Sequence, residues 1–120
     1  MEYEYKQVQN QTDWVEETSH LRQMYTDAMP EVMSGQDAVR DATYKDGAIS
    51  RKMKHLIAMA IAIRIGCQRC IVFQPKLAIE QGATKEEILE AASVAIAMGG
   101  TPSIGWTTHI VKYLEEQGMM

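Results

Sequence analysis

The chain has 120 residues, with 12 basic and 16 acidic side chains and a formal charge of −4. This length predicts one domain over 1–120, because two halves would each be too small to bury an adequate core. The acidic balance argues against a nucleic-acid partner, and the apolar run 56–63 is too short to cross a bilayer. The polar segment Met1 to Lys6 has no apolar stretch behind it, so we expect a cytoplasmic protein without a secretory signal or membrane role.

Every strong local signal in the chain is helical, and no segment has the sustained alternation of a strand. Asp13 and Glu16 have the spacing of a helix start, which predicts a first helix over 13–29. Pro30 suits the first turn of a second helix that reaches about Tyr44. We expect the first helix to turn four apolar side chains inward: Trp14, Val15, Leu21 and Met24.

The second half of the chain predicts four more helices. The third begins after Ser50 and ends at Gly66, and the fourth begins around two cysteines and stops at Gly82. Thr84 and Glu87 have capping-box spacing, so a fifth helix starts there. The expected ranges of the last two helices are 84–98 and 101–117. The predicted fold is all-α: a single-domain bundle of about six helices, with the cysteines on a helix-turn-helix hairpin.

The third and fifth predicted helices are apolar almost all round, in the runs 56–63 and 88–98. Helices of this kind are buried on every side. A monomer of 120 residues can hardly cover two of them, so we expect a homo-oligomer. The alternative is that small Ala-rich helices pack closely in a compact monomer.

Cys67 and Cys70 are the only cysteines, and they form a Cys-x-x-Cys pair just after Gly66. Two thiols at this spacing can close a small disulfide ring, and a helix N-terminus favours the reactive thiolate. In a reducing compartment such a pair is more often catalytic or metal-binding than a structural crosslink. Two other interpretations stay open: a packed apolar pair, or half of a zinc site completed by two of His20, His55 and His109.

An antiparallel hairpin with its turn near Gly66 places His55 opposite Gln74. Gln74 is four residues after Cys70 and therefore on the same helix face. A chain from His55 through Gln74 to Cys70 is thus available, in which His55 is the base, since an amide cannot take up the proton. The alternative for His55 is a helix-end residue that faces water.

Pro75 lies five residues after Cys70 and limits where the fourth helix can begin. A proline well inside a helix loses a backbone hydrogen bond and costs about 3 kcal/mol. We therefore expect the regular helix to begin close to Cys70, with Pro75 in or near its first turn and the cysteines at the helix mouth. If the helix begins earlier, a kink is expected at Pro75.

The order of motifs in residues 52–100 is specific. It consists of an apolar helix from His55, the Cys67-Gln-Arg-Cys70 pair, a second helix, a Gly-Ala-Thr cap at 82–84 with acidic residues, and a third helix before Gly99-Gly100. This segment resembles the alkylhydroperoxidase D-like and carboxymuconolactone decarboxylase superfamily. The resemblance implies an all-helical fold that assembles as trimers or hexamers.

The redox-active relatives, as the resemblance implies, use a proton relay. It runs from a glutamate twelve residues before the first cysteine through a histidine four residues after the second. His55 and Gln74 occupy these two positions here, so both depart from the pattern. One hypothesis is a compensating exchange, in which the histidine has moved to the other helix and keeps an imidazole near Cys70.

The function that we expect is a thiol-disulfide oxidoreductase that reduces a disulfide or a peroxide through a Cys67–Cys70 disulfide. Helix-mouth geometry favours Cys67 as the attacking thiol, whereas the relay that the resemblance implies favours Cys70. We expect the relay to deprotonate Cys70, with Cys67 as its disulfide partner. No bound cofactor is required, so electrons come from an external thiol or a separate reductase. One alternative is a decarboxylase-type enzyme on a small acid, with Arg64 or Arg69 and a histidine as binding groups. The other is a non-enzymatic oligomeric module whose cysteines are packed or hold zinc.

Overall fold

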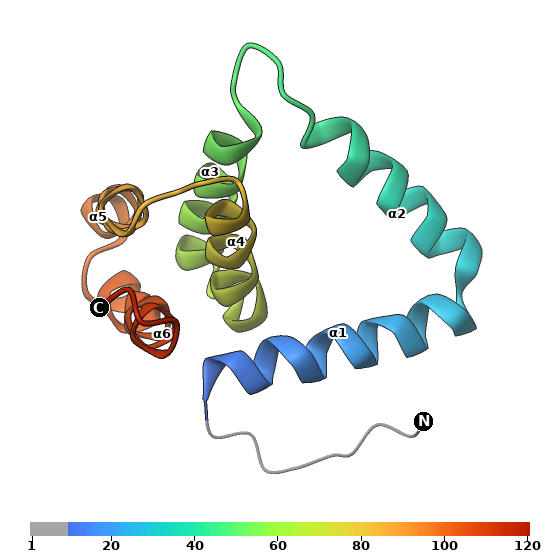
Figure 1. Cartoon of the computed structure of the whole chain (residues 1–120), viewed down its shortest axis with the longest axis horizontal. Helices are drawn as coiled ribbons and strands as arrows, with labels where there is room; N and C mark the ends of the chain where they lie inside the picture. Colours follow the sequence, from blue (N-terminus) through green and yellow to red (C-terminus); the bar gives the residue numbers. More distant parts are fainter. Residues whose placement is uncertain (1–9) are drawn as a thin grey trace.

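The computed structural model describes residues 10–120, which form six α-helices and no strand. The polar start of the chain, Met1 to Lys6, lies outside the described residues. Figure 1 labels the helices, and their bounds are α1 Gln11–Ala28, α2 Pro30–Thr43, α3 Arg51–Ile65, α4 Gln68–Glu80, α5 Lys85–Gly99 and α6 Thr101–Glu116. The predicted all-α fold, with the cysteines on the α3–α4 hairpin, is confirmed. No described helix is both long enough and apolar enough to cross a membrane.

The core lies among α3, α4, α5 and α6. α3 packs on α4 and α5, and α6 packs on α4 and α5, so the four helices enclose one apolar cluster. The large side chains at its centre have no or almost no exposed surface: Met59, Ile63, Ile71, Ile88, Ile110 and Leu114. This cluster fixes the hairpin that carries the cysteines.

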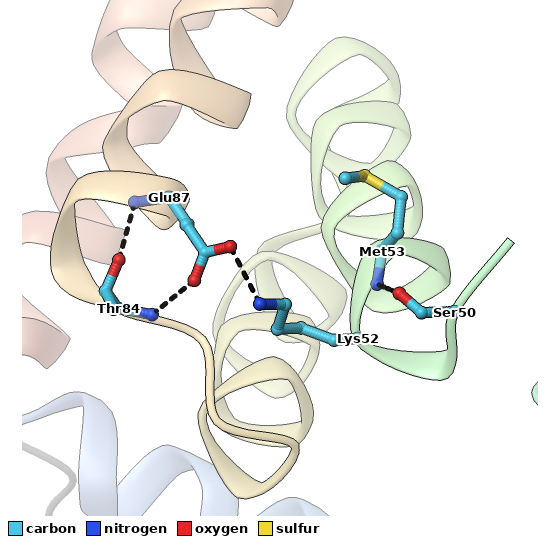
Figure 2. Close-up of polar contacts among 5 residues, drawn as sticks. All are labelled: Ser50, Lys52, Met53, Thr84 and Glu87. Atoms are coloured by element: carbon cyan, nitrogen blue, oxygen red, sulfur yellow. Dashed lines mark hydrogen bonds and ion pairs between the residues drawn. The ribbon is translucent and has the colours of Figure 1, made fainter. Parts of the chain in front are cut away.

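Local caps set the boundaries of α3 and α5 (Figure 2). The Ser50 hydroxyl accepts a hydrogen bond from the Met53 amide at 3.1 Å. Thr84 and Glu87 form a reciprocal capping box, with bonds of 3.1 and 3.0 Å. The Glu87 carboxylate also pairs with Lys52 at 2.8 Å, which ties the start of α5 to the first turn of α3. Both predicted helix starts are therefore confirmed.

Gly66 ends α3 in the left-handed region, at φ 74°. A Cβ atom at this position would meet the Trp106 ring at 3.3 Å, so the turn passes close against α6. Glycine is the residue that takes this backbone conformation without strain. The chain reverses here and places Cys67 at the mouth of α4.

α1 differs from its prediction in both its start and its burial. The helix begins at Gln11, because the Asn10 side chain, not Asp13, accepts the capping bond, at 2.7 Å. Val15 is buried as expected, but Leu21 and Met24 are 40% and 54% exposed. The reason is that the first half of α1 packs on the body while its second half extends beyond it toward α2 (Figure 1).

α2 stands apart from the four-helix core. In Figure 1 it follows α1 at the edge of the molecule, separated from α3 and α4, and its packing partner is α1. Met33 is its one buried residue. Arg22 of α1 pairs with Asp37 of α2 at 2.8 Å, an exposed ion pair that contributes little stability. α1 and α2 thus form an arm around one side of the α3–α4 hairpin.

α3 and α5 are not buried on every side in the single chain. Four apolar side chains spaced four residues apart form an exposed stripe along α3, with exposures of 45%, 43%, 55% and 73%: Met53, Ile57, Ile61 and Ile65. On α5, Val94 and Met98 are 61% and 77% exposed. The chain itself therefore buries only the sides of α3 and α5 that face the core, and the rest of their apolar surface is exposed in the single chain.

Candidate active site around Cys67 and Cys70

Cys67 and Cys70 are joined in a disulfide, with their Cα atoms 5.3 Å apart. Cys67 is the N-cap residue of α4, and its sulfur accepts a hydrogen bond from the Cys70 amide at 3.2 Å. This places the pair at the helix mouth, as predicted. The amides and dipole of the first turn favour negative charge on a sulfur there.

A cavity of about 500 Å³ lies between the arm and α4. Of the two cysteines, Cys70 lines it. Its apolar wall includes Met33 and Val39 of α2 and Phe73 and Leu77 of α4. Both cysteine residues are partly buried, and because only Cys70 lines the cavity, a substrate there reaches Cys70 before Cys67.

His55 and Gln74 meet across the hairpin, with Nδ1 of the imidazole 2.8 Å from Oε1 of the amide. His55 is 2% exposed, so the interpretation of a helix-end histidine that faces water is wrong. The Tyr44 ring stacks on the imidazole, with centroids 4.2 Å apart and planes 5° apart. Tyr44 was not singled out from the sequence, since it lies in a loop-flanking position with no motif.

The pKa of His55 is lowered, first by burial and then by the nearby Arg51 and Arg40 charges, and the hydrogen bond to Gln74 opposes this only in part. The imidazole is therefore neutral at pH 7. Because the amide oxygen accepts, Nδ1 carries the proton and Nε2 has the lone pair.

Neither ring nitrogen of His55 is bonded to a cysteine. Nδ1 is bonded to Gln74, and Nε2 is buried with no hydrogen-bond partner among the described residues. Within the described part of the chain there is therefore no hydrogen bond through which Cys70 could pass its proton directly to His55. Gln74 lines the Cys70 cavity while its oxygen is held by His55, so the NH₂ group is the part of the amide left for the cavity.

Arg69 lies between the cysteines in sequence but is not the exposed arginine that its position suggests. Its guanidinium lies 3.9 Å from the centre of the Trp14 ring. It also donates to the Thr18 hydroxyl and to the Trp14 carbonyl. A cation over an aromatic face is stabilised electrostatically. Arg69 thus holds α1 against the cysteine turn. The contact could not be predicted from the sequence, because Trp14 and Arg69 are 55 residues apart and form no motif.

Pro75 lies inside α4, not in its first turn, because the helix already begins at Gln68. Its ring is buried in the core side of the helix. The missing backbone donor leaves the Ile71 carbonyl without its usual partner. The expectation of a late helix start is wrong, because the Cys67 cap stabilises the earlier one.

The other sequence candidates lie away from this cavity. Arg64 lies beside Gly99, and His109 is 5.7 Å from the Trp106 ring on α6. His20 is on α1. The described residues contain no group of three or more His, Cys, Asp or Glu side chains placed to hold a metal ion.

Comparison with known proteins identifies the family. Residues 30–113 match the model of the carboxymuconolactone decarboxylase family. An uncharacterised protein of Cupriavidus necator is 33% identical over 88 residues, which are 73% of this chain and 78% of that protein.

Solved structures agree. A carboxymuconolactone decarboxylase family protein of Legionella pneumophila superposes with a TM-score of 0.84 at 34% identity, over 88% of this chain and 95% of that one. A Thermotoga maritima protein gives a TM-score of 0.80 at 25% identity, over 88% and 93% of the two chains. A second structure describes that protein as a member of the same family for which a part in an antioxidative response has been suggested. With a family match over 30–113 and relatives of this similarity, the chain belongs to the carboxymuconolactone decarboxylase family.

Proposed function

We propose that the protein is a thiol-disulfide oxidoreductase that uses Cys67 and Cys70 to reduce a disulfide or a peroxide. The observation that carries the proposal is the placement of Cys70: it lies on a cavity of about 500 Å³ and within disulfide distance of Cys67. The suggested antioxidative role of the Thermotoga maritima relative is consistent with it.

In the reduced protein, the Cys70 thiolate attacks one sulfur of a disulfide RSSR and releases RS⁻. Cys67 then attacks the Cys70 sulfur and releases the second thiolate, so the substrate gains two electrons and the protein is left with the Cys67–Cys70 disulfide. With a peroxide ROOH, Cys70 becomes a sulfenic acid and ROH leaves; Cys67 then displaces water. An external thiol or reductase returns the two electrons.

The amide of Gln74 stabilises the Cys70 thiolate in this proposal. Its oxygen is held by His55 at 2.8 Å, which leaves the NH₂ group to donate into the cavity that Cys70 lines. His55 acts through Gln74 as a positioning residue, since its basic Nε2 is not bonded toward the sulfurs. In this proposal the proton of the Cys70 thiol is therefore transferred to water in the cavity and not to the imidazole.

We also propose that the protein is a homo-oligomer, a trimer or hexamer as its family resemblance implies. The exposed α3 stripe of Met53, Ile57, Ile61 and Ile65 supports self-association, because a monomer rarely leaves such a row in water. Ile61→Glu should lower the mass measured by light scattering. Glu31→Lys, an exposed charge change on α2, is the control.

The redox proposal is tested with the pre-reduced protein and two probes, Ellman's reagent and tert-butyl hydroperoxide. The wild type should reduce about one equivalent of at least one probe and regain its internal disulfide, as seen by mass spectrometry. Cys70→Ser should prevent formation of the internal disulfide and slow attack on either probe, because Cys67 does not line the cavity. Cys67→Ser should stop at a mixed disulfide with the first probe, or at a sulfenate trapped by dimedone with the second.

Transfer of electrons to neither probe by the reduced wild type would overturn the proposal. Equal rates in the wild type and the Cys67→Ser, Cys70→Ser double variant would do the same, because the electrons would then not come from these two thiols.

A further inference from the structure

A second cavity, of about 320 Å³, is lined by His55 but by neither cysteine. The end of α2, the loop that follows it and the first turns of α3 enclose it. Three cationic side chains line it: Arg40, Lys45 and Arg51. The redox chemistry proposed above uses none of them.

His55 also lines this cavity, and its Nε2 atom is an unsatisfied acceptor. The side chain is 98% buried, since its relative exposure is 2%, and no described residue donates to Nε2. A buried polar atom left without a partner costs about 1–3 kcal/mol. Because Nδ1 already carries the proton, Nε2 can only accept, so the group that satisfies it must be a donor.

The charges of the cavity favour an anion. Two carboxylates, Asp41 and Asp46, accompany the three cations, which leaves one positive charge in excess while His55 is neutral. One oxygen of Asp46 already accepts the Arg51 amide at 2.7 Å. The N-terminus of α3 adds its own positive potential at the same place.

We infer that this cavity binds a small oxyanion that carries a hydroxyl donor, with Arg40, Lys45 and Arg51 around the charge and the hydroxyl donating to His55 Nε2. Hydrogen phosphate meets both requirements, as does a phosphate ester of a small hydroxylated molecule; the volume of about 320 Å³ admits either. Tyr44, like Arg40, lines both cavities, and its ring stacks on the imidazole. Because Nε2 is buried, binding of the hydroxyl requires the partly exposed Tyr44 ring to move aside.

Comparing phosphate with sulfate at pH 8 separates the need for negative charge from the need for a hydroxyl donor. Both are then mainly dianions of similar size, but only hydrogen phosphate has an O–H donor. Calorimetric titration of the full chain should give phosphate binding about fivefold tighter than sulfate, the effect of one neutral hydrogen bond. Glycerol 3-phosphate is the third ligand to titrate. If it binds more tightly than phosphate, the natural ligand is a phosphate ester; if it binds more weakly, the natural ligand is the free ion.

Three variants test the assignment. Arg51→Ala should lower the affinity for phosphate and for sulfate alike, by about tenfold, because one charged contact is lost. His55→Leu should weaken phosphate but not sulfate, so that the ratio between them falls to about one. Cys67→Ser, Cys70→Ser should leave binding unchanged, which separates this inference from the redox proposal.

A readout independent of affinity is the histidine ¹⁵N spectrum. The Nε2 resonance of His55 should move on addition of phosphate and stay in place with sulfate, while Nδ1 keeps its proton. Equal affinity for the two anions, no binding of either at millimolar concentration, or an Nε2 resonance that phosphate does not move would each overturn the inference.

Discussion

The imidazole of His55 and the carboxamide of Gln74 form one hydrogen-bonded unit across the α3–α4 turn, 2.8 Å apart, with α3 supplying one partner and α4 the other. Gln74 faces the cavity of Cys70, and His55 faces the cavity of Arg40 and Arg51. The unit therefore joins two cavities, whose linings also share Arg40 and Tyr44.

Gln74→Leu should raise the pKa of the reduced Cys70 thiol by about one unit, because a hydrogen bond to the thiolate is lost while the volume is kept. The pH dependence of iodoacetamide alkylation measures this pKa, with Cys67→Ser as the background. Gln36→Leu is the matched control, since Gln36 lines the same cavity from α2 and should leave the pKa in place. An unchanged pKa in Gln74→Leu would remove the amide from the mechanism.

Acid should destabilise the fold through His55. Its pKa is lowered from 6.5 by burial, so below about pH 6.5 the unfolded chain takes up a proton that the folded chain does not. The free energy of unfolding should therefore fall as the pH drops below 6.5, and this group should contribute no slope above it.

Urea unfolding between pH 5 and 8 checks this, with His55→Leu as the comparison: the slope just below pH 6.5 should be smaller in the variant. Glu87 and Glu116, whose pKa values are lowered from 4.5, lose their contributions at lower pH and do not overlap with this window. The same slope in both proteins would show that His55 is not the group responsible.

Trp14→Leu should loosen α1 from the cysteine turn. The variant loses the cation–π contact with Arg69, which lowers the free energy of unfolding by about 1–2 kcal/mol. Hydrogen exchange should show faster exchange in α1 but not in α5. Tyr25→Leu, an aromatic residue that is 54% exposed on the same helix, should change neither quantity by much. Equal effects of the two variants would contradict the role given to Arg69.

Three glycine-to-alanine variants should separate backbone strain from contact. Gly66→Ala forces φ 74° on alanine and brings its Cβ to 3.3 Å from Trp106, so it should cost about 1–2 kcal/mol or more. Gly82→Ala carries the strain at φ 89° without a contact and should cost less. Gly105→Ala lies in a helix with open space and should stabilise by about 1 kcal/mol. Thermal unfolding gives the order, and a harmless Gly66→Ala would contradict the account of the turn.

Local chemistry explains why most of the fold could be predicted from the sequence. The Ser50 cap, the Thr84 and Glu87 capping box and the Gly66 terminator act within a few residues, and the structure contains all three. The predicted start of α1, at Asp13, differs by two residues from the observed start at Gln11. Asn10 and Asp13 are both good N-cap residues, and which of them caps the helix depends on a distant partner. That partner is Glu116, whose carboxylate accepts the Gln11 and Thr12 amides at 2.9 and 2.8 Å.

The candidate site was predictable only where the hairpin itself sets the geometry. Counting residues from the turn placed His55 opposite Gln74, and the two are in contact. The Arg69–Trp14 contact and the Tyr44 stack depend on where the arm lies, and no periodicity encodes that position. The tautomer of His55, with the proton on Nδ1 and the lone pair on Nε2, could be assigned only from the hydrogen bond to Gln74 in the structure.

The placement of α2 links chemistry at Cys70 to local stability. α2 supplies one wall of the cavity and packs on α1, and its last residue is tied to α3, where the Lys54 ammonium donates to the Thr43 carbonyl at 2.8 Å. Segments with few contacts to a core are those that open locally at the lowest free-energy cost. In the redox chemistry proposed above, a bulky oxidised protein would need such an opening of α2 to reach the sulfur, whereas a small thiol reagent would not. The reactivity ratio between large and small reagents thus becomes a gauge of how often this segment opens.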